Sequence, residues 1–358
     1  MMPESRTTTM AEPMLLPPLP EQASVSIVIP CRNEQGYIGR CLRSIEQADQ
    51  VPGRVTVVIC DGLSEDGTRQ EVEDFTTRLP WMVMIDNVQR TTPHALNLGL
   101  RFHASDVGII LGAHSTIDKN FITGSLEALR RDLQVGCAGG VIINQYEDVH
   151  TRQIGSAMGH PFGVGGAHFR TGARTGYVDT VAFGAYRREV FERIGHFDEK
   201  LVRNQDDEFN YRVNQAGFRI LLDPAIRSTY FVRASFSRLY RQYHQYGYWK
   251  VYVNHKHRAV TTFRQVMPAL LVLSLFGGAP LCIVFPHLRP LYLIGTALYL
   301  GAALFSASRA CVTKSDLCGV VRAFVTLHLA YGMGYWRGIL DFILLRRGPD
   351  TRSTRTSR

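Results

Sequence analysis

The chain has 358 residues, which is enough for two domains or for one domain joined to membrane segments. Its net charge is +9, but the basic residues form no compact patch with interleaved aromatics, which argues against nucleic acid as a partner. Many lie beside long apolar runs, which favours an anionic membrane surface. The seven cysteines show no CxxC pair and no regular spacing, which argues against a disulfide framework or structural zinc site and indicates a reducing, cytosolic environment.

Residues 1–22 contain five prolines and no long apolar core, so we expect a disordered tail rather than a signal peptide. Short apolar strands and helices then alternate along the chain. Strands are expected at 24–29, 54–60, 81–85 and 107–111, and helices at 35–48, 65–79 and 93–103. This alternation predicts an α/β fold with a doubly wound, mostly parallel sheet.

Ligands of such sheets bind beyond the carboxyl ends of the strands, and polar loops follow three of these strands. The first loop runs from Pro30 to Glu34, the second from Asp61 to Thr68, and Gly112-Ala113-His114 follows the fourth strand. Asp61 ends its strand at a glycine, so its carboxylate is expected either to accept hydrogen bonds from a uracil or ribose or to cap its own turn. No GxGxxG or GxxxxGK[ST] pattern follows the first strand, which argues against a dinucleotide-binding Rossmann domain and a P-loop.

Residues 204–208 read Asn-Gln-Asp-Asp-Glu. Three adjacent carboxylates repel one another, so such a cluster marks either a solvated turn or a reaction centre. The cluster alone favours the turn, whereas its place after a nucleotide-binding half favours the reaction centre. The glycine-rich stretch 155–176 before it is expected to be either a mobile loop over the site or a plain surface loop.

The last hundred residues contain long runs without charge. Residues 266–285 and 290–308 are each free of Lys, Arg, Asp and Glu, and a turn at 286–290 joins them. A run of about 20 apolar residues can span a bilayer, so we expect a transmembrane hairpin, with a buried hairpin of a soluble domain as the alternative.

A third apolar helix is expected near 320–345, but only residues 323–336 of it lack charge. A run this short suits an interfacial or re-entrant helix better than a span. Two spans would also return the basic tail 346–358, expected to be disordered, to the cytoplasm, as the positive-inside rule requires. Residues 236–252 mix aromatic and basic side chains, which is typical of a helix at headgroup level, although a soluble amphipathic helix would carry them too.

Three segments in order, Val25–Glu34, Asp61–Thr68 and Asn204–Arg212, resemble the motifs of glycosyltransferase family 2. The resemblance covers about residues 23–232. Within the family, the chain is similar to membrane-anchored glucosyltransferases that make succinoglycan, an exopolysaccharide. The resemblance implies a GT-A fold at 23–232. Together with the apolar and aromatic-basic segments, this predicts interfacial helices at 233–265, a membrane region at 266–345 and a catalytic domain on the cytoplasmic side of the inner membrane.

The resemblance also implies roles for individual residues. The residues expected to bind the nucleotide-sugar are Pro30, Arg32, Asn33, Glu34, Asp61, Gly62, Ser64, Asn97 and His114. By register, Asp206 is the expected general base of an inverting reaction, with Asp207 beside it. Glu208, Arg241 and Trp249 are expected to contact the acceptor or its diphosphate.

The metal site is where the chain departs from the family pattern. Gly112-Ala113-His114 stands where the family has Asp-x-Asp, so the first carboxylate is missing. The resemblance implies a divalent cation, Mn²⁺ or Mg²⁺. His114 could bind Mn²⁺, with Asp118 or water, or could contact the diphosphate directly, because histidine prefers softer ions than Mg²⁺.

The implied function is transfer of one sugar from a UDP-hexose to a polyprenyl-diphosphate-linked acceptor in cell-surface polysaccharide synthesis. A processive polysaccharide synthase and a non-catalytic membrane scaffold remain alternatives. A nucleotidyltransferase is disfavoured, because the first loop lacks the glycine-rich, lysine-bearing sequence that such an enzyme needs.

Overall fold

The structure is a computed structural model that describes residues 14–172, 175–232, 235–261 and 263–349. The chain divides into two compact units. The sheet unit comprises the residues up to Ile143, Gly172–Lys200 and Gln205–Thr229. The helical unit comprises Asn144–Thr171, Leu201–Asn204 and the residues from Tyr230 onward. Residues 144–171, which we expected within the glycosyltransferase domain, therefore group with the helices.

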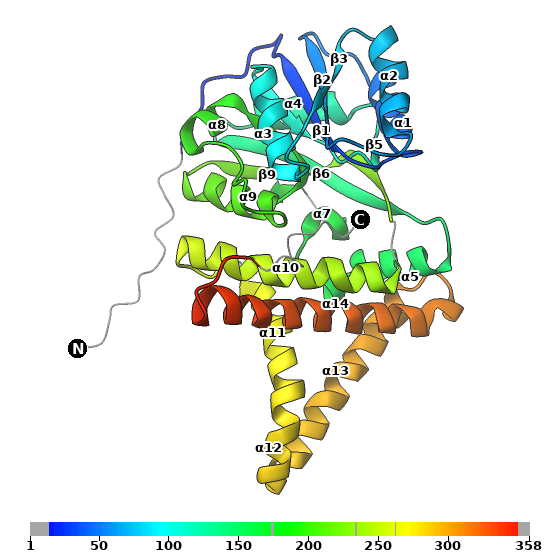
Figure 1. The fold of residues 1–358 in the computed structure, drawn as a ribbon, viewed down its shortest axis with the longest axis vertical. Coiled ribbons are helices and arrows are strands. Elements are labelled where there is room, and N and C mark those ends of the chain that lie inside the picture. The colour runs from blue at the N-terminus through cyan, green and yellow to red at the C-terminus, as the bar shows by residue number, and fades with distance from the viewer. Residues whose placement is uncertain (1–13, 173–174, 233–234, 262, 350–358) are drawn as a thin grey trace, which may run out of the picture. The chain divides into compact units, whose positions relative to one another are not determined.

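Within the described residues, the sheet unit is built on a nine-stranded sheet with the order β3-β2-β1-β4-β8-β6-β9-β5, and β7 pairs with β9 (Figure 1). The strands are β1 Val25–Cys31, β2 Val55–Asp61, β3 Met82–Asp86, β4 Val107–Ile110, β5 Ser115–Ile117, β6 Val135–Gln145, β7 Gly176–Tyr177, β8 Ala182–Arg187 and β9 Arg219–Phe231.

The predicted parallel arrangement is confirmed for the first four strands. β1 pairs in parallel with β2 and β4, and β2 pairs in parallel with β3. The register places Cys31 opposite Asp61, and Asp61 opposite Asp86, so the ends of β1, β2 and β3 are level. Beyond β4 the sheet is mixed, because β8 runs antiparallel to both β4 and β6.

Helices that connect the strands cover this sheet: α1 Ile38–Glu46, α2 Thr68–Arg78, α3 Thr92–Phe102, α4 Phe121–Arg130, α8 Arg188–Ile194 and α9 Gln205–Gln215. Their apolar spacing explains the packing. On α1, Ile38, Leu42 and Ile45 recur at helical spacing, and all three are buried in the core that the strands form. Pro93 lies in the first turn of α3, where its missing N–H breaks no helical hydrogen bond.

The amino-terminal segment differs from the expected disordered tail. Leu16 and Leu19 are buried, and the Leu16 amide donates a hydrogen bond to the Leu133 carbonyl at 2.8 Å. The guanidinium of Arg187 donates to the Pro17 carbonyl at 2.6 Å. Leu16, Leu19 and these hydrogen bonds therefore hold residues 14–22 against the rest of the sheet unit. The remainder of the predicted tail, residues 1–13, lies outside the described residues.

The helical unit contains α5 Val149–Met158, α6 Pro161–Val164, α7 His168–Thr171, α10 Phe236–His257, α11 Met267–Val272, α12 Gly278–Val284, α13 Arg289–Ala310 and α14 Leu317–Gly338. The predicted glycine-rich loop at 155–176 is wrong for most of its length, because α5, α6 and α7 occupy it. A capping box starts α5, in which the Asp148 carboxylate accepts from the Thr151 amide.

In the described part of the chain, three stretches of helix are long and apolar enough to cross a membrane: Arg264–Val284, Pro286–Ala310 and Lys314–Leu344. The first two coincide with the predicted hairpin segments. Figure 1 shows them as a hairpin whose base meets the paired helices α10 and α14. The predicted basic tail begins at Arg346, and its residues 350–358 lie outside the described part of the chain.

Glycines allow α10 and α14 to pack with their backbones in close approach. A Cβ added at Gly247 of α10 would lie 2.0 Å from the Tyr331 carbonyl oxygen, and one at Gly334 of α14 would lie 2.0 Å from the His244 carbonyl oxygen. A Cβ at Gly338 would lie 2.7 Å from the Tyr248 carbonyl oxygen. No larger residue fits at these positions without separating the helices.

We therefore expect Gly247→Ala to lower the stability of the purified protein in detergent by roughly 1–3 kcal/mol, because the added methyl group overpacks the α10–α14 contact. Gly295→Ala on α13 is the matched control, since no atom lies within 4 Å of the position that its added methyl group would take. Thermal unfolding of both variants checks this. Equal melting temperatures for the two would contradict the close packing.

Candidate active site

The loops that follow β1 and β2 are joined by hydrogen bonds into one surface. The Asn33 amide donates to the Ser64 hydroxyl at 2.9 Å, and the Glu65 amide donates to the Asn33 side-chain oxygen at 2.9 Å. The Glu34 amide donates to the Thr68 hydroxyl at 2.7 Å. Asn33 takes a positive φ of 51°, a conformation that asparagine tolerates better than most residues. The structure thus brings together the two polar loops that the sequence singled out.

Asp61 lies at the centre of this surface with 0% of its side chain exposed. One of its carboxylate oxygens accepts from Arg69 Nη1 at 2.7 Å and from the Ser64 amide at 3.0 Å, and the other accepts from the Ser64 hydroxyl. Asp61 caps its own turn at the carboxyl end of β2, as expected, and its contact with a uracil or ribose stays a prediction. A ligand at this strand end would first meet Arg69, not the carboxylate.

Sequence reasoning missed Arg69 and Asp86. The same Arg69 nitrogen that binds Asp61 also donates to Asp86 Oδ1 at 2.8 Å, and the Asp86 hydrogen bond raises the pKa of the guanidinium. Asp86 is 52% exposed at the end of β3. The alternation of strands and helices places the end of β3 beside that of β2, so a carboxylate ending the third predicted strand was the available signal.

Arg32 extends over Gly62. A Cβ added at Gly62 would lie 3.2 Å from both Cβ and Cδ of Arg32, so glycine makes room for this side chain. Arg32 Nε is buried and has no hydrogen-bond partner among the described residues. A buried donor of this kind is costly unless a ligand or water satisfies it. Pro30, the remaining predicted residue of this loop, lies in β1 opposite Cys60.

His114 joins this surface from the end of β4. Its Nδ1 lies 3.5 Å from Oε1 of Glu34, whose side chain is 1% exposed. Burial raises the pKa of the Cys41 thiol, and the Glu34 carboxylate adds to that rise. Among the described residues, no group of three or more His, Cys, Asp or Glu side chains is arranged to hold a metal ion. His114 and Glu34 alone offer one nitrogen and one carboxylate donor.

The acidic cluster lies in the first turn of α9, where negative charge interacts favourably with the helix dipole. Asp206 is exposed and its carboxylate accepts from the Asp207 amide at 2.9 Å. Burial raises the pKa of the neighbouring Tyr186 phenol well above its usual value, and the charges of Cys137 and Asp206 contribute. The phenol donates to the side-chain oxygen of Asn210 at 2.8 Å, which fixes it against α9.

Glu208 has a different environment from the two aspartates. Its side chain is 0% exposed, and its carboxylate accepts from Arg212 Nε at 3.0 Å and Nη2 at 3.0 Å. The same guanidinium donates to the carbonyl oxygens of Ile194 at 2.6 Å and His196 at 2.8 Å. Glu208 thus holds Arg212, which ties α9 to the chain that follows α8.

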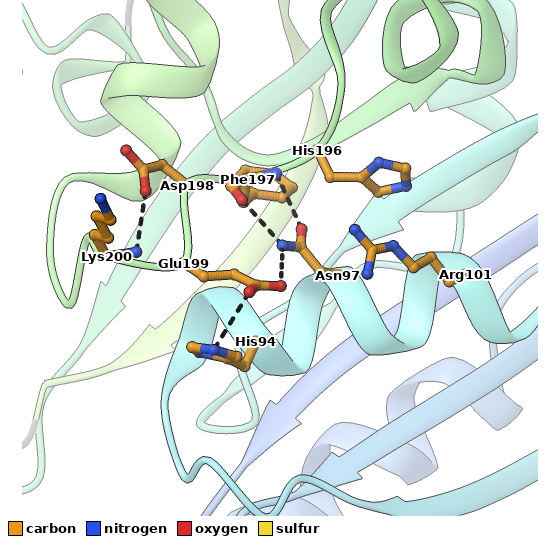
Figure 2. Close-up of a pocket in the computed structure, with 8 residues that line it drawn as sticks. All are labelled: His94, Asn97, Arg101, His196, Phe197, Asp198, Glu199 and Lys200. Carbon is orange, nitrogen blue, oxygen red and sulfur yellow. Dashed lines mark hydrogen bonds and ion pairs between the residues drawn. The ribbon is translucent and has the colours of Figure 1, made fainter. Parts of the chain in front are cut away.

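Asn97 also holds a loop. Its amide nitrogen donates to the Phe197 carbonyl and to a Glu199 carboxylate oxygen, each at 2.9 Å, and its oxygen accepts from the Phe197 amide at 2.9 Å (Figure 2). These residues line a hollow of about 610 Å³ between α3 and residues 196–200. Nearby, His94 Nε2 lies 3.4 Å from Glu199, and burial lowers the pKa of His196, with Arg101 adding to the effect.

The two remaining predicted residues, Arg241 and Trp249, belong to α10 of the helical unit. Arg241 is exposed. Trp249 has 0% exposure, and its ring lies 5.9 Å from that of Tyr248 and 6.2 Å from that of Phe342. Stacking of Trp249 on an acceptor sugar, as the sequence predicts, would require this packing to open.

The chain is similar to known proteins over most of its length. The sequence profile described as Glycosyl transferase family 2 matches residues 26–195. The succinoglycan biosynthesis protein ExoA of Rhizobium meliloti (strain 1021) is 30% identical over 320 residues, which cover 88% of this chain and 95% of that protein. A Methanococcus voltae enzyme, dolichyl N-acetyl-alpha-D-glucosaminyl phosphate 3-beta-D-2,3-diacetamido-2,3-dideoxy-beta-D-glucuronosyltransferase, is 27% identical over 62% of this chain and 71% of its own length.

Among solved structures, the mannosyltransferase PcManGT of Pyrobaculum calidifontis, in complex with GDP-Man and Mn²⁺, superposes with a TM-score of 0.56 over 90% of each chain. The two sequences are 19% identical, so the likeness concerns the fold. The predicted GT-A-type fold is therefore confirmed. Together with the near-complete coverage of the R. meliloti protein, these matches show that the chain belongs to glycosyltransferase family 2 and is a glycosyltransferase.

Proposed function

We propose that this glycosyltransferase is an inverting enzyme that moves one hexose from a UDP-sugar to a polyprenyl-diphosphate-linked acceptor in exopolysaccharide synthesis. The relatives support the acceptor class, since one is named for succinoglycan biosynthesis and another for a dolichyl phosphate sugar. The observation that carries the proposal is the difference in environment within the acidic cluster. Asp206 is exposed, whereas Glu208 is buried and bound by Arg212.

The donor would bind at the joined loops after β1 and β2, with the residues predicted from sequence. Asn33 and Ser64 already fix the shape of this surface, and the unsatisfied Nε of Arg32 offers a donor to it. Arg69 adds a cation at the same strand ends. This cation would attract the diphosphate of the donor or a hydrogen-bond acceptor atom of its nucleobase. We assign Asn97 a structural role, in which it holds residues 197–199 in place, rather than a contact with the donor. Its side-chain amide is already bonded to the backbone of Phe197.

Asp206 would serve as the general base. The acceptor hydroxyl oxygen attacks the anomeric carbon, its proton passes to the Asp206 carboxylate, and the bond from the anomeric carbon to the diphosphate oxygen breaks. The nucleoside diphosphate leaves with that electron pair, and the configuration inverts. Asp207 would assist from the adjacent position, while Glu208 would keep α9 in place through Arg212.

His114 and Glu34 fit a divalent cation as part of its ligand shell, because the nearby nitrogen and carboxylate oxygen are donors that suit Mn²⁺ better than Mg²⁺. Diphosphate and water oxygens would have to complete the shell. Such a cation, when bound, would neutralise the charge of the departing diphosphate. This assignment is consistent with Mn²⁺ in the P. calidifontis mannosyltransferase.

The apolar hairpin formed by Arg264–Val284 and Pro286–Ala310 would anchor the enzyme in the inner membrane, with the sheet unit in the cytoplasm. Arg241, exposed on α10, would meet the acceptor diphosphate. Glu208 and Trp249, predicted for the same role, are buried and would support the fold instead. The product distinguishes this function from the alternatives: a processive synthase extends the lipid acceptor by many sugars, and a scaffold adds none.

We expect Asp206→Asn to reduce sugar transfer by about 10²–10⁴-fold, because the amide cannot take the acceptor proton, while UDP-sugar binding and thermal stability stay near those of the wild type. Glu208→Gln is the matched comparison on the same helical turn. Because Glu208→Gln breaks a buried ion pair with Arg212, we expect this variant to be less stable than the wild type by about 3–5 kcal/mol. Transfer assays, calorimetric titration of the UDP-sugar and thermal unfolding measure these effects. Wild-type turnover by the Asp206→Asn variant would contradict the base assignment.

For the cation site, we expect His114→Ala to weaken Mn²⁺ binding by about tenfold or more in the presence of UDP, since one of the two protein ligands is lost. The electron paramagnetic resonance signal of free Mn²⁺ measures binding without reliance on turnover. His103→Ala, at the end of α3, is the control. Unchanged Mn²⁺ affinity in His114→Ala would assign His114 to the diphosphate instead. Transfer assays with UDP-, GDP- and dTDP-sugars, with and without Mn²⁺, test the donor.

A further inference from the structure

We propose that α14 lies in the plane of the membrane at headgroup level, as an interfacial helix clamped along α10, and that only the hairpin crosses the bilayer. By length and composition, Lys314–Leu344 could be a third span. The contacts of α14 within the helical unit argue against it. The membrane surface that α14 would recognise is independent of the proposed reaction.

The position of α14 follows that of α10. The two helices lie side by side in Figure 1, and their glycines bring the backbones into contact at Gly247, Gly334 and Gly338. α10 carries Arg238, Arg241, Lys250 and Lys256, and Arg258 caps its end. The hydrocarbon core does not accept this many cations on one helix. Because α14 cannot enter the core without α10, it stays at the surface.

Two buried carboxylates hold α14 at its two ends. At the start, Asp316 is 1% exposed and accepts from Arg152 Nε at 2.8 Å and Nη2 at 3.0 Å, which ties α14 to α5. Just beyond the other end, Asp341 is 4% exposed and accepts from Arg337 Nε at 3.0 Å and from the Tyr248 hydroxyl at 3.1 Å. The buried Asp316 pair is costly to separate, so it fixes the start of α14 against α5, and the Tyr248 hydroxyl ties Asp341 to α10.

The surface of α14 also differs from that of the hairpin. Within its most apolar window, 44% of the residues are buried against the protein, compared with 17% in each hairpin helix. Only residues 323–336 lack charge, which is about 21 Å of helix, whereas the hydrocarbon core is about 30 Å thick. A span would place Arg322 or Arg337 inside the core.

α14 and the π-helical turn after it, Ile339–Leu344, leave exposed an apolar stripe of Met333, Trp336, Leu340 and Ile343, at spacings of three and four residues. The exposed cations Arg322 and Arg337 flank the stripe, and Trp336 donates its indole N–H to the Ala269 carbonyl in the first hairpin helix. A tryptophan with a bonded N–H beside cations is typical of the headgroup boundary. The stripe is therefore continuous with the lipid-facing surface of the hairpin.

Charge complementarity points to an anionic bilayer. Residues 235–349 contain thirteen Lys and Arg residues but only two acids, and both acids are the buried Asp316 and Asp341. This segment therefore carries 13 − 2 = +11 of formal charge, more than the +9 of the whole chain. Exposed cations next to the membrane attract anionic headgroups by about 1 kcal/mol each.

Spin labels at different depths test the inference with the full-length protein in phosphatidylcholine–phosphatidylglycerol vesicles. The exposed native Cys318 is one labelling site, and Met333→Cys and Leu340→Cys add two more. Cys311 is replaced in every variant, and Cys318 is also replaced in the variants that carry an added cysteine. Leu291→Cys, Leu298→Cys and Phe305→Cys report on α13. We expect one depth near the phosphates for the two labels on α14 and the one at Leu340 just after it, and a deep minimum at Leu298. A Met333 label at the bilayer centre would overturn the proposal.

Sidedness gives a second, independent readout. In the same cysteine background, Gly348→Cys, Thr77→Cys on α2 and His287→Cys at the hairpin turn are labelled with a membrane-impermeant maleimide on sealed vesicles. We expect Gly348→Cys and Thr77→Cys to react from the same side and His287→Cys from the other. Reaction of Gly348→Cys together with His287→Cys would mean that α14 crosses the bilayer and would refute the inference.

Discussion

The parallel pairing of β1 with β2 is the constraint on which the candidate site depends. The register sets Cys31 opposite Asp61, so two loops that are thirty residues apart in the chain emerge side by side. Hydrogen bonds then join the two loops, as between the Asn33 amide and the Ser64 hydroxyl. β3 joins at the same level and adds Asp86. A shift of one residue in this register would turn every one of these side chains to the opposite face.

Much of this arrangement could be predicted from sequence, because it rests on local patterns. The apolar runs of β1 to β4 and the helical spacing of Ile38, Leu42 and Ile45 are found where the sequence placed them. The acidic residues 206–208 do begin a helix. The pairing of Glu208 with Arg212 was also visible in principle, since the two residues are four apart on one helical face.

The features that sequence reasoning missed depend on tertiary contacts. Arg69 has ordinary helical surroundings in sequence, and only the register of β2 and β3 gives it two carboxylates. Leu16 and Leu19 lie in a proline-rich stretch that reads as disordered, yet the sheet unit offers them a buried position. The glycines of residues 155–176 suggested a loop, because glycine disfavours helices in isolation, whereas α5 to α7 form helices within a packed unit. Trp249 was expected to contact the acceptor because the family resemblance implies that role for its position, but its packing against Tyr248 and Phe342 cannot be read from the sequence.

The hydrogen bonds of Arg212 affect which parts of the sequence can change without moving the helix that carries Asp206. Its guanidinium links Glu208 on α9 to the carbonyl oxygens of Ile194 and His196, so the direction of the helix that carries Asp206 is set by residues that touch no substrate. The residues proposed to contact the donor, by contrast, belong to segments that end before residue 115. In the proposed mechanism, catalytic geometry and donor preference are therefore encoded in separate stretches of the chain. Selection could then change the sugar that is used while leaving the position of the proposed base intact.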